Sequence, residues 1–294
     1  MINKDIPAVS LDFSSHSLEL KVNKISRFYK QREALYIGKA HRLRFNALVY
    51  ITAGEGYHFI DYKRYSIKAG TLLTLGRHQV HHFAEHSSVE GYVISFNNAF
   101  LQSRGGDPFE DLIASALQEV NCISDTDDIL RSLFEQVSQE YKNKQNRYRE
   151  EIIRHLMRVI MLKQVVPYYE ALRHDDSSQS YNSGYYALKS QIEQVFTERP
   201  PVSAVANMMG KSAKQLDKIA KDYSGKSVKE LLDDRVLLEA KRLLAFSQHS
   251  IAEISLQLGF KEATNMTKFF KRHTDLTPKD FRELCRSNVS KRAI

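Results

Sequence analysis

The feature that most constrains the fold is a pattern near the end of the chain, between residues 251 and 281. A short segment repeats isoleucine and leucine at helical spacing as far as Leu258. Gly259 then interrupts the pattern, as a tight turn with positive φ requires. The next segment has methionine and phenylalanine on one side and threonine and lysine on the other, and Thr277-Pro278 ends the unit. A helix, a glycine turn and a second helix with an exposed hydroxyl and lysine face indicate a DNA-binding helix-turn-helix motif.

The same pattern occurs a second time upstream, with Gly210 at its turn. The two turn glycines are 49 residues apart (259 − 210 = 49). Ser212 is placed to cap the helix after the first turn, about residues 213–223. Between the copies, Val228 to Phe246 is predicted to form one continuous helix. A single copy is often only a helical hairpin in a core, but two copies joined by a helix favour DNA binding.

The predicted DNA-facing side chains are those on the polar side of the second helix of each motif. They are Lys214, Gln215, Lys218 and Lys221 in the first motif, and Ala263, Thr264, Asn265, Thr267, Lys268 and Lys271 in the second. We expect Thr264 and Thr267 to lie near bases and the lysines to lie near bases or phosphates. Asp217 is an acid on the same face of the first motif, where it is placed to pair with Lys214 or Lys221.

The distribution of charge supports a polyanionic partner for the C-terminal part. From Tyr185 to the end the chain has 20 basic and 13 acidic residues, a net charge of +7. The remaining residues have 23 basic and 22 acidic side chains (43 − 20 and 35 − 13) and are nearly neutral. An excess of positive charge confined to one domain is typical of nucleic-acid binding. A membrane surface fits less well, because no amphipathic anchor is present in the sequence.

Residues 187–286 resemble the DNA-binding domain of the AraC/XylS family of transcriptional regulators. The matching segments read RVLLEAKRLLAFSQHSIAEISLQLGF, FFKRH and TPKDFR. Two departures occur, with Thr264-Asn265-Met266 where the family usually carries Ser-Tyr, and Asp275-Leu276 where it carries glycine before Thr-Pro. The resemblance implies a regulator with two helix-turn-helix motifs, with double-stranded DNA and RNA polymerase, if it activates, as partners.

The N-terminal part has a different pattern. Short β-branched and aromatic runs between residues 18 and 96, separated by turn residues, predict a small β-barrel or sandwich. Gly54-Glu55-Gly56 and Asp61-Tyr62-Lys63 are the predicted hairpin turns. A polar stretch lacking aliphatic residues, Asp175 to Gly184, reads as a linker. The predicted domains are therefore residues 1–174 and 185–294, joined by the linker 175–184.

Two helices are predicted after the strands, over Asp127 to Lys142 and Tyr148 to Arg173. The second has an apolar surface too wide for one small sheet to cover, which favours a homodimer formed by this hairpin. The predicted dimer residues are Ile152, Leu156, Val159, Ile160 and Lys163. The alternative is that the barrel alone covers the apolar surface.

The barrel region resembles the cupin-type sensing domain of the same family, through Gly54-x-Gly56, Lys68-x-Gly70 and Gln79-Val80-His81. The resemblance implies an α+β chain of more than one domain, with a cupin-like barrel and helical hairpin followed by an all-α domain. It also raises the alternative of a cupin-like metal enzyme with an appended DNA-binding domain. Only His81, with His58 or His41, is placed to ligate a metal, and His81 and His82 should point to opposite faces of a strand. We therefore expect no metal and no cofactor.

A small barrel can enclose one ligand, so we expect a small-molecule effector of unidentified chemistry. The candidate contacts are polar and aromatic strand residues, namely Tyr50, His58, Tyr65, Arg77, His78, His81 and Tyr92. The sequence carries no phosphate-binding glycine loop, nucleophile elbow or dinucleotide fingerprint, so we expect no enzyme activity. A protein that bends DNA without reading it is a further alternative, disfavoured because no apolar wedge is apparent. Two cysteines, and no apolar run of signal-peptide or membrane-span length, predict a cytoplasmic protein.

Overall fold

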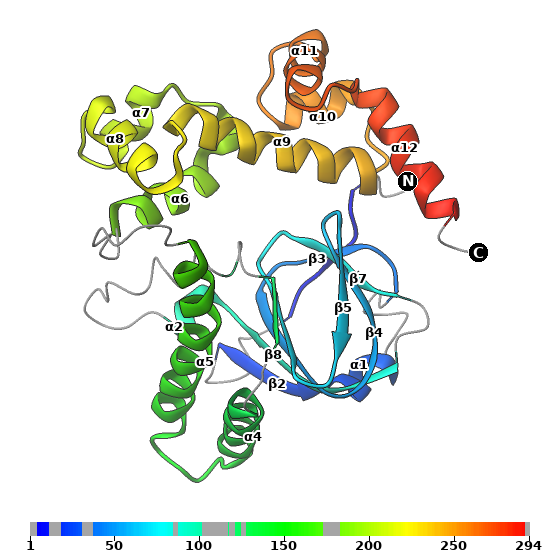
Figure 1. The fold of residues 1–294 in the computed structure, drawn as a ribbon, viewed down its shortest axis with the longest axis vertical. Helices are drawn as coiled ribbons and strands as arrows, with labels where there is room; N and C mark the ends of the chain where they lie inside the picture. Colours follow the sequence, from blue (N-terminus) through cyan, green and yellow to red (C-terminus); the bar gives the residue numbers. More distant parts are fainter. Residues whose placement is uncertain are drawn as a thin grey trace. The chain divides into compact units, whose positions relative to one another are not determined.

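The computed structural model describes residues 5–11, 19–30, 38–84, 88–101, 117, 121–124, 128–172 and 183–291. The chain divides into two compact units, one made of residues 7–179 and the other of residues 1–6 with 180–294. The first unit holds the strands and the second is helical (Figure 1). Most of the predicted linker lies outside the described residues, although its last two residues, Ser183 and Gly184, belong to the first helix of the helical unit.

The described strands form one curled sheet. They are β1 (Ala8–Val9), β2 (Leu20–Lys24), β3 (His41–Leu43), β4 (Asn46–Ile60), β5 (Lys63–Lys68), β6 (Thr71–Leu75), β7 (Val80–Phe83), β8 (Ser88–Phe96) and β9 (Cys122–Ser124). The order is β1-β3-β7-β4-β6-β9, with β8 between β2 and β4, and β5 paired with β4. Of these pairs only β1 with β3 is parallel. Short helices α1 (Ile25–Lys30) and α2 (Asn98–Leu101) follow β2 and β8.

Strand β4 makes the sheet curl because it pairs with four other strands along its length. It pairs with β6 over Ala47–Tyr50, with β8 over Asn46–Glu55, and with β5 and β7 near its end. A bulge between Ile51 and Ala53, followed by Gly54 at φ 82°, bends the strand without ending it. The hairpin turn predicted at Gly54-Glu55-Gly56 is therefore wrong, since β4 continues to Ile60. The second predicted turn is confirmed, because Asp61 (φ 54°) and Tyr62 connect paired β4 and β5.

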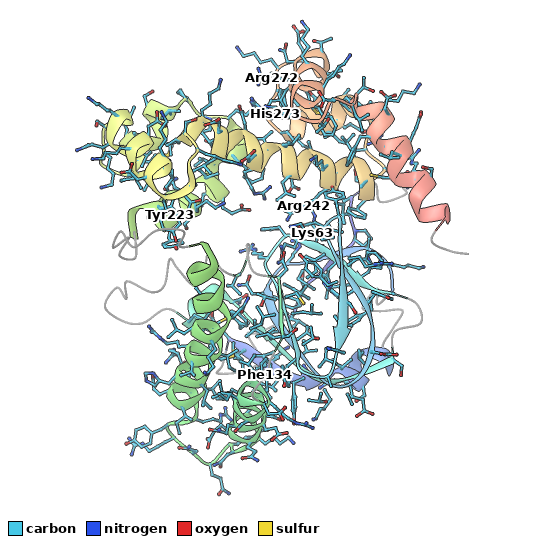
Figure 2. The ribbon with its side chains drawn as sticks, in the orientation of Figure 1. Lys63, Phe134, Tyr223, Arg242, Arg272 and His273 are labelled. Carbon is cyan, nitrogen blue, oxygen red and sulfur yellow. The ribbon has the colours of Figure 1, made fainter. Side chains whose placement is uncertain are left out.

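The two faces of the sheet belong to different hydrophobic clusters. Leu48 and Tyr50 of β4 face the helical hairpin α4 (Ile129–Lys142) and α5 (Arg149–Leu172), where Phe134 packs on the sheet (Figure 2). Val49 and Ile51 face the concave interior with side chains from β3, β6 and β8. Both predicted helices of this unit are confirmed to within two residues at each end. The hairpin therefore covers the outer face of the sheet, and the concave face has a hydrophobic cluster of its own.

The helical unit contains the two predicted motifs. Its elements are α6 (Ser183–Val195), the 3₁₀ turn η1 (Phe196–Glu198), α7 (Val202–Met208), α8 (Ala213–Ser224), α9 (Val228–Phe246), α10 (Ile251–Gln257), α11 (Ala263–Thr274) and α12 (Pro278–Lys291). The pairs α7–α8 and α10–α11 lie at opposite ends of α9 (Figure 1). Capping boxes begin three of the helices, with Ser212, Ser227 and Ser250 each bonded to a Gln or Glu three residues on. The predicted cap at Ser212 is thereby confirmed.

Arg199 joins the start of this unit to its second motif. The guanidinium carbon lies 3.9 Å from the ring centre of Phe260 and 5.1 Å from that of Phe269. One guanidinium nitrogen is 3.8 Å from a carboxylate oxygen of Asp233 on α9. Cation–π contacts of this kind stabilise a packed arrangement most when they are sheltered from water. The segment before the first motif, the connecting helix and the second motif are thus packed together around one side chain.

Candidate DNA-binding surface and effector cavity

The second helix of the first motif presents a cationic face. Lys214, Gln215, Lys218 and Lys221 of α8 are all exposed, while Leu216 and Ala220 are buried on the opposite side. Gln215 also has a structural contact, since its side-chain oxygen accepts a hydrogen bond from the Ser212 backbone N–H at 2.9 Å. The three lysines therefore provide most of the available surface charge on α8.

Asp217 has a role at the junction of α8 and α9. Its carboxylate accepts a hydrogen bond of 2.9 Å from the backbone N–H of Val228, the first residue of α9. The first N–H groups of a helix have no partner within the helix, so this bond helps to fix where α9 begins. The sequence interpretation placed this carboxylate on the DNA-facing surface beside lysines. The structure directs one of its oxygens to the connecting helix instead.

The second motif presents a more polar face on α11. Thr264, Asn265, Lys268 and Lys271 are exposed, whereas Ala263 and Thr267 are partly buried. The Thr264 hydroxyl donates to the Glu262 carboxylate at 3.0 Å, before the helix begins. The Thr267 hydroxyl donates to the Ala263 carbonyl oxygen at 2.9 Å. In this arrangement the hydroxyl can only accept a hydrogen bond from a DNA base. Lys268 therefore has the freest long side chain near the middle of the helix.

Further exposed cations border the predicted set. Lys261 precedes α11 and Arg272 lies near its last turn, close to His273 in Figure 2. An Arg272 guanidinium nitrogen lies 3.4 Å from a ring nitrogen of His273, which restrains it beside the helix end. The prediction from sequence omitted both cations because it selected only the polar face of each second helix. Basic residues at the ends of DNA-binding motifs commonly contact phosphates. This general rule could have identified both cations from the sequence.

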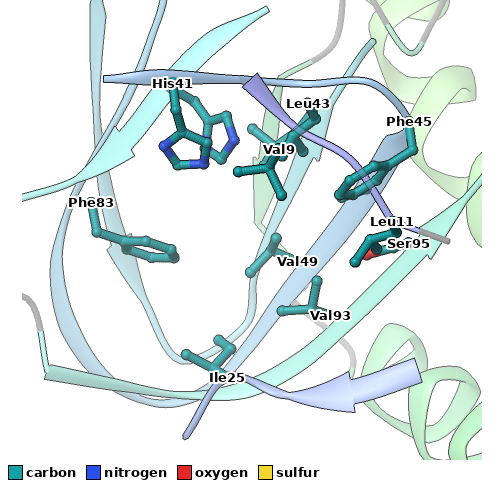
Figure 3. A pocket seen from close by; sticks show the side chains of 13 residues that line it. Val9, Leu11, Ile25, His41, Leu43, Phe45, Val49, Phe83, Val93 and Ser95 are labelled. Atoms are coloured by element: carbon teal, nitrogen blue, oxygen red, sulfur yellow. The ribbon is translucent and has the colours of Figure 1, made fainter. Parts of the chain in front are cut away.

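The concave side of the sheet contains a cavity of about 70 Å³. It lies within the strand-rich unit, and Figure 3 shows most of its wall. Three lining residues are polar and the others are apolar. The polar ones are His41, His81 and Ser95, and the apolar ones are Val9, Leu11, Ile25, Leu43, Phe45, Ala47, Val49, Leu75, Phe83 and Val93. The cavity can therefore accept a small molecule that is mainly hydrocarbon.

Three imidazole rings meet at one side of this cavity. His41 and His81 are direct cross-strand neighbours on β3 and β7, with ring centres 4.3 Å apart. The ring of His58 on β4 is 5.3 Å from that of His81. Both ring nitrogens of His58 and of His81 are buried without a hydrogen-bond partner, while His41 Nδ1 is 2.8 Å from the Lys39 carbonyl oxygen. The prediction that only two of these histidines would converge is corrected, because strand pairing brings the third beside them.

His58 and His81 are electrically neutral at physiological pH. Burial, with the neighbouring His82 and His41, lowers the pKa of His58 to about 3. Burial also lowers the pKa of His81 well below its ordinary value, and the other three histidines nearby act in the same direction. Within the described parts of the chain, no group of three or more His, Cys, Asp or Glu side chains is arranged to hold a metal ion. Neutral imidazoles remain available for hydrogen bonding, each with one donor and one acceptor.

The seven predicted effector contacts lie in several different environments. His81 alone lines the cavity, and His58 lies directly behind it. Tyr50 and Tyr92 lie on the outer face of the sheet, in the cluster with Phe134. Side chains alternate between the two faces along a strand, and these two fall on the face that meets the hairpin. Tyr65 packs beside the interior cluster, Arg77 is exposed, and His78 lies in a turn at φ 73°. As predicted, His82 points away from its neighbour His81, and its ring stacks on Phe59 at 4.7 Å.

The proposed dimer residues on α5 are also divided between two sides. Ile152 and Val159 are 36% and 42% exposed, and Lys163 is exposed beside them. Leu156 is partly buried against the core, whereas Ile160 is fully buried in it. Ile160 is therefore not available to a second subunit, because the sheet and α4 cover that side of the helix. The remaining apolar surface is narrower than the sequence indicated.

Comparisons with known proteins agree with both halves of this description. A family model described as a helix-turn-helix domain matches residues 205–284, and one described as an AraC-like ligand binding domain matches residues 26–158. The probable transcription factor PqrA of Proteus vulgaris is 35% identical over 96 residues, which are 33% of this chain and 77% of PqrA. The transcriptional activator RhaS of Salmonella schwarzengrund (strain CVM19633) is 29% identical over 96 residues, 33% of this chain but only 34% of RhaS.

Among solved structures, ToxT from Vibrio cholerae is 11% identical, with 90% of this chain and 98% of that chain covered and a TM-score of 0.41. No described helix is long and apolar enough to cross a membrane. The resemblance that the sequence suggested is confirmed in both domains, as is the α+β arrangement of a curled sheet followed by helices. On the match to PqrA together with both family models, the chain belongs to the AraC/XylS family of transcriptional regulators, and it is a DNA-binding regulator with an N-terminal effector-binding domain.

Proposed function

We propose that α8 and α11 are recognition helices that enter successive major grooves on one side of the duplex. The observation that supports this is the matched pair of exposed faces, with lysines on α8 and with threonine, asparagine and lysines on α11. The connecting helix α9 has 19 residues, which at 1.5 Å per residue gives a length of about 28 Å. Successive major-groove sites on one side are about 34 Å apart, so α9 is the right length to separate the two helices.

The ten predicted DNA contacts divide by chemistry in this proposal. Lys214, Lys218 and Lys221 neutralise phosphates, which gives affinity but little sequence information. Thr264, Asn265 and Lys268 face base edges, where they distinguish one sequence from another. Gln215 and Thr267 orient the ends of their helices as well as meeting DNA. Ala263 allows close approach of the backbone, and Lys271 meets phosphate at the far end of α11.

Replacing two residues of α11 tests this assignment. An operator is first selected from a random DNA pool with the full-length protein, and affinity is measured by fluorescence anisotropy at fixed salt. The double substitution Thr264→Ala with Lys268→Ala should lower specific affinity by about 2–4 kcal/mol, at ~1–3 kcal/mol for a good base contact. A matched control changes Lys63 and Ser66, an exposed lysine and hydroxyl on β5, and should leave affinity unchanged. Full operator affinity in the α11 variant would show that this helix does not read the sequence.

The assembly and regulation follow from the other surfaces. The exposed part of α5, with Ile152, Val159 and Lys163 and the edge of Leu156, is the proposed homodimer contact. A small-molecule effector in the concave cavity alters how each subunit presents its recognition helices, with RNA polymerase as a partner if the regulator activates. The protein acts in the cytoplasm and has no catalytic activity in this proposal. The absence of enzyme function is supported by its regulator relatives, PqrA and RhaS.

A further inference from the structure

The wall of the concave cavity restricts the chemistry of the effector. Ten of its thirteen lining residues are apolar, and none of the lining residues is Lys, Arg, Asp or Glu. A buried carboxylate or ammonium group is costly unless an opposite charge or several hydrogen bonds compensate it. The cavity offers no such charge, so a fully ionised ligand group would be poorly accommodated here.

Two buried polar groups in this wall have no hydrogen-bond partner. The His81 side chain is 6% exposed with both ring nitrogens unsatisfied, and Ser95 is 1% exposed with its hydroxyl oxygen unsatisfied. Leaving such groups unpaired costs roughly 1–3 kcal/mol each, and native proteins seldom do so. Figure 3 shows Ser95 on the side of the cavity away from His41. A ligand group at the imidazole end can satisfy His81 while hydrocarbon fills the middle.

The protonation state of the His81 ring decides which ligand group it can hydrogen-bond. Its pKa is lowered by burial and by the neighbouring His41, His58 and His82, so the ring is neutral. A neutral imidazole presents one N–H donor and one nitrogen acceptor. A hydroxyl group can pair with whichever ring nitrogen faces it, because it can donate to the unprotonated nitrogen or accept from the N–H. A carboxylate can only accept, so it could pair with His81 only through the ring N–H, and it would bring an uncompensated charge into the cavity.

The small number of polar side chains in the wall excludes ligands with many polar groups of their own. A sugar would bury several hydroxyls against only three polar side chains. Each hydroxyl left without a partner would cost about as much as one good hydrogen bond contributes. A hydrocarbon chain with one hydroxyl buries a single polar group and avoids this cost.

We infer that the effector is an uncharged, mainly hydrocarbon small molecule with a hydroxyl group that hydrogen-bonds His81. This inference rests on the proposed function in one respect, namely that the concave cavity is the effector site. It adds the chemical class of the ligand and assigns His81 as the residue that selects it.

Three small probe molecules test the proposed chemical class of the effector. Their binding to the full-length protein is measured by ligand-observed NMR. The probes are 1-hexanol, hexanoate and glucose at pH 7.5. We expect 1-hexanol to bind, hexanoate to bind at least about tenfold more weakly because its charge is not compensated, and glucose not to bind. Hexanoate binding should strengthen as the pH falls toward the pKa of the acid. Preferred binding of glucose, or of hexanoate at pH 7.5, overturns the inference, as does a failure of 1-hexanol to bind.

Two substitutions on adjacent residues test the role of His81. His81→Phe keeps a flat ring but removes both nitrogens, and it should weaken 1-hexanol binding about 3- to 10-fold, the value of one hydrogen bond. His82→Phe is the matched control, because His82 stacks on Phe59 outside the cavity and a phenyl ring preserves that stack. Equal affinities of the two variants for 1-hexanol would remove His81 from the site.

A third substitution keeps the test decisive if His81→Phe does not fold. Val49→Phe leaves the histidines intact and fills the cavity with a ring, so 1-hexanol binding should be lost. Continued binding to this variant would show that the cavity is not the site. Operator affinity is measured on every folded variant without probe and should not change. Operator binding serves here as the check on folding. Unchanged probe binding by Val49→Phe would count against the cavity as the effector site, whereas equal probe affinities of His81→Phe and His82→Phe would count only against the effector class.

Discussion

Gly210 and Gly259 hold the same place in the two helix-turn-helix motifs, but their surroundings differ. Both have positive φ, 63° and 74°, which costs an L-residue roughly 1–2 kcal/mol. A Cβ on Gly259 would lie 2.1 Å from the backbone oxygen of Thr197, whereas nothing described lies within 4 Å of a Cβ on Gly210. The second turn is thus packed against the backbone of another segment, whereas no described atom packs against the first turn at this position.

This difference predicts unequal effects of the same substitution. Gly210→Ala should lower the free energy of unfolding by about 1 kcal/mol, the cost of its backbone conformation. Gly259→Ala should lower it by about 2–5 kcal/mol, because overpacking is added to the same backbone cost. Urea unfolding of both variants, followed by circular dichroism, measures the two values. Equal losses would mean that Thr197 moves away freely from the second turn.

His58 predicts a dependence of stability on acid pH. Its pKa is about 3 in the folded protein, below the 6.5 of an unfolded histidine. Between these values the unfolded chain binds more protons, so stability is present above pH 6.5 and is lost as the pH falls below it. The loss is about 1.4 kcal/mol per pH unit for this group, or roughly 2 kcal/mol by pH 5. His58→Phe should remove that part of the slope, which urea titrations at pH 7 and pH 5 measure. An unchanged slope would contradict the burial of the ring.

At the scale of the element, α8 is expected to act through charge. Lys218→Ala removes one phosphate contact, so the slope of log affinity against log salt should become shallower by about one unit. Lys144→Ala, an exposed lysine between α4 and α5, is the control and should leave the slope unchanged. Anisotropy titrations at several salt concentrations measure both. If Lys218→Ala and its control have the same slope, α8 supports the fold and α11 alone contacts DNA.

The helices were predictable from sequence because their ends carry local signals. Ser212 and Ser250 begin capping boxes, and Gly210 and Gly259 mark the turns, so neighbouring residues decide each boundary. The sheet was less predictable. Strand β4 is buried on both faces over Asn46–Ile51. The sequence there does not alternate between apolar and polar residues, so it could not show which face of the sheet Tyr50 lies on. The bulge after Ile51 also turns an expected hairpin into one continuous strand.

The ligand cavity was the least predictable feature, because it depends on contacts between distant strands. His41 meets His81 through the pairing of β3 with β7, and His58 joins them because Ile60, two residues further on β4, pairs with His81. Nothing in the sequence near any one histidine specifies that register. The identities of the residues were visible in advance, but their convergence was not.

At the scale of the whole molecule, the exposed surface of α5 is expected to join two chains. Val159 is 42% exposed, so Val159→Asp should change stability little in a single chain but place a charge in an apolar contact between subunits. Sedimentation velocity should show a folded monomer with weaker operator binding. Ile129→Asp, at a similarly exposed isoleucine on α4, is the control and should remain dimeric. A Val159→Asp protein that stays dimeric would place the contact elsewhere.

The packing around Arg199 also affects how a promoter can change. Arg199 contacts Phe260 and Phe269 of the second motif and Asp233 of the connecting helix, so it braces the second motif against α9. Inserting one base pair between the two halves of an operator turns one half by roughly 35° and shifts it by about 3.4 Å relative to the other. In the proposed binding mode, a protein braced at this point resists that change. Mutations that substitute spacer bases should therefore be inherited freely in the target promoters, whereas insertions and deletions in the same spacer should be eliminated by selection.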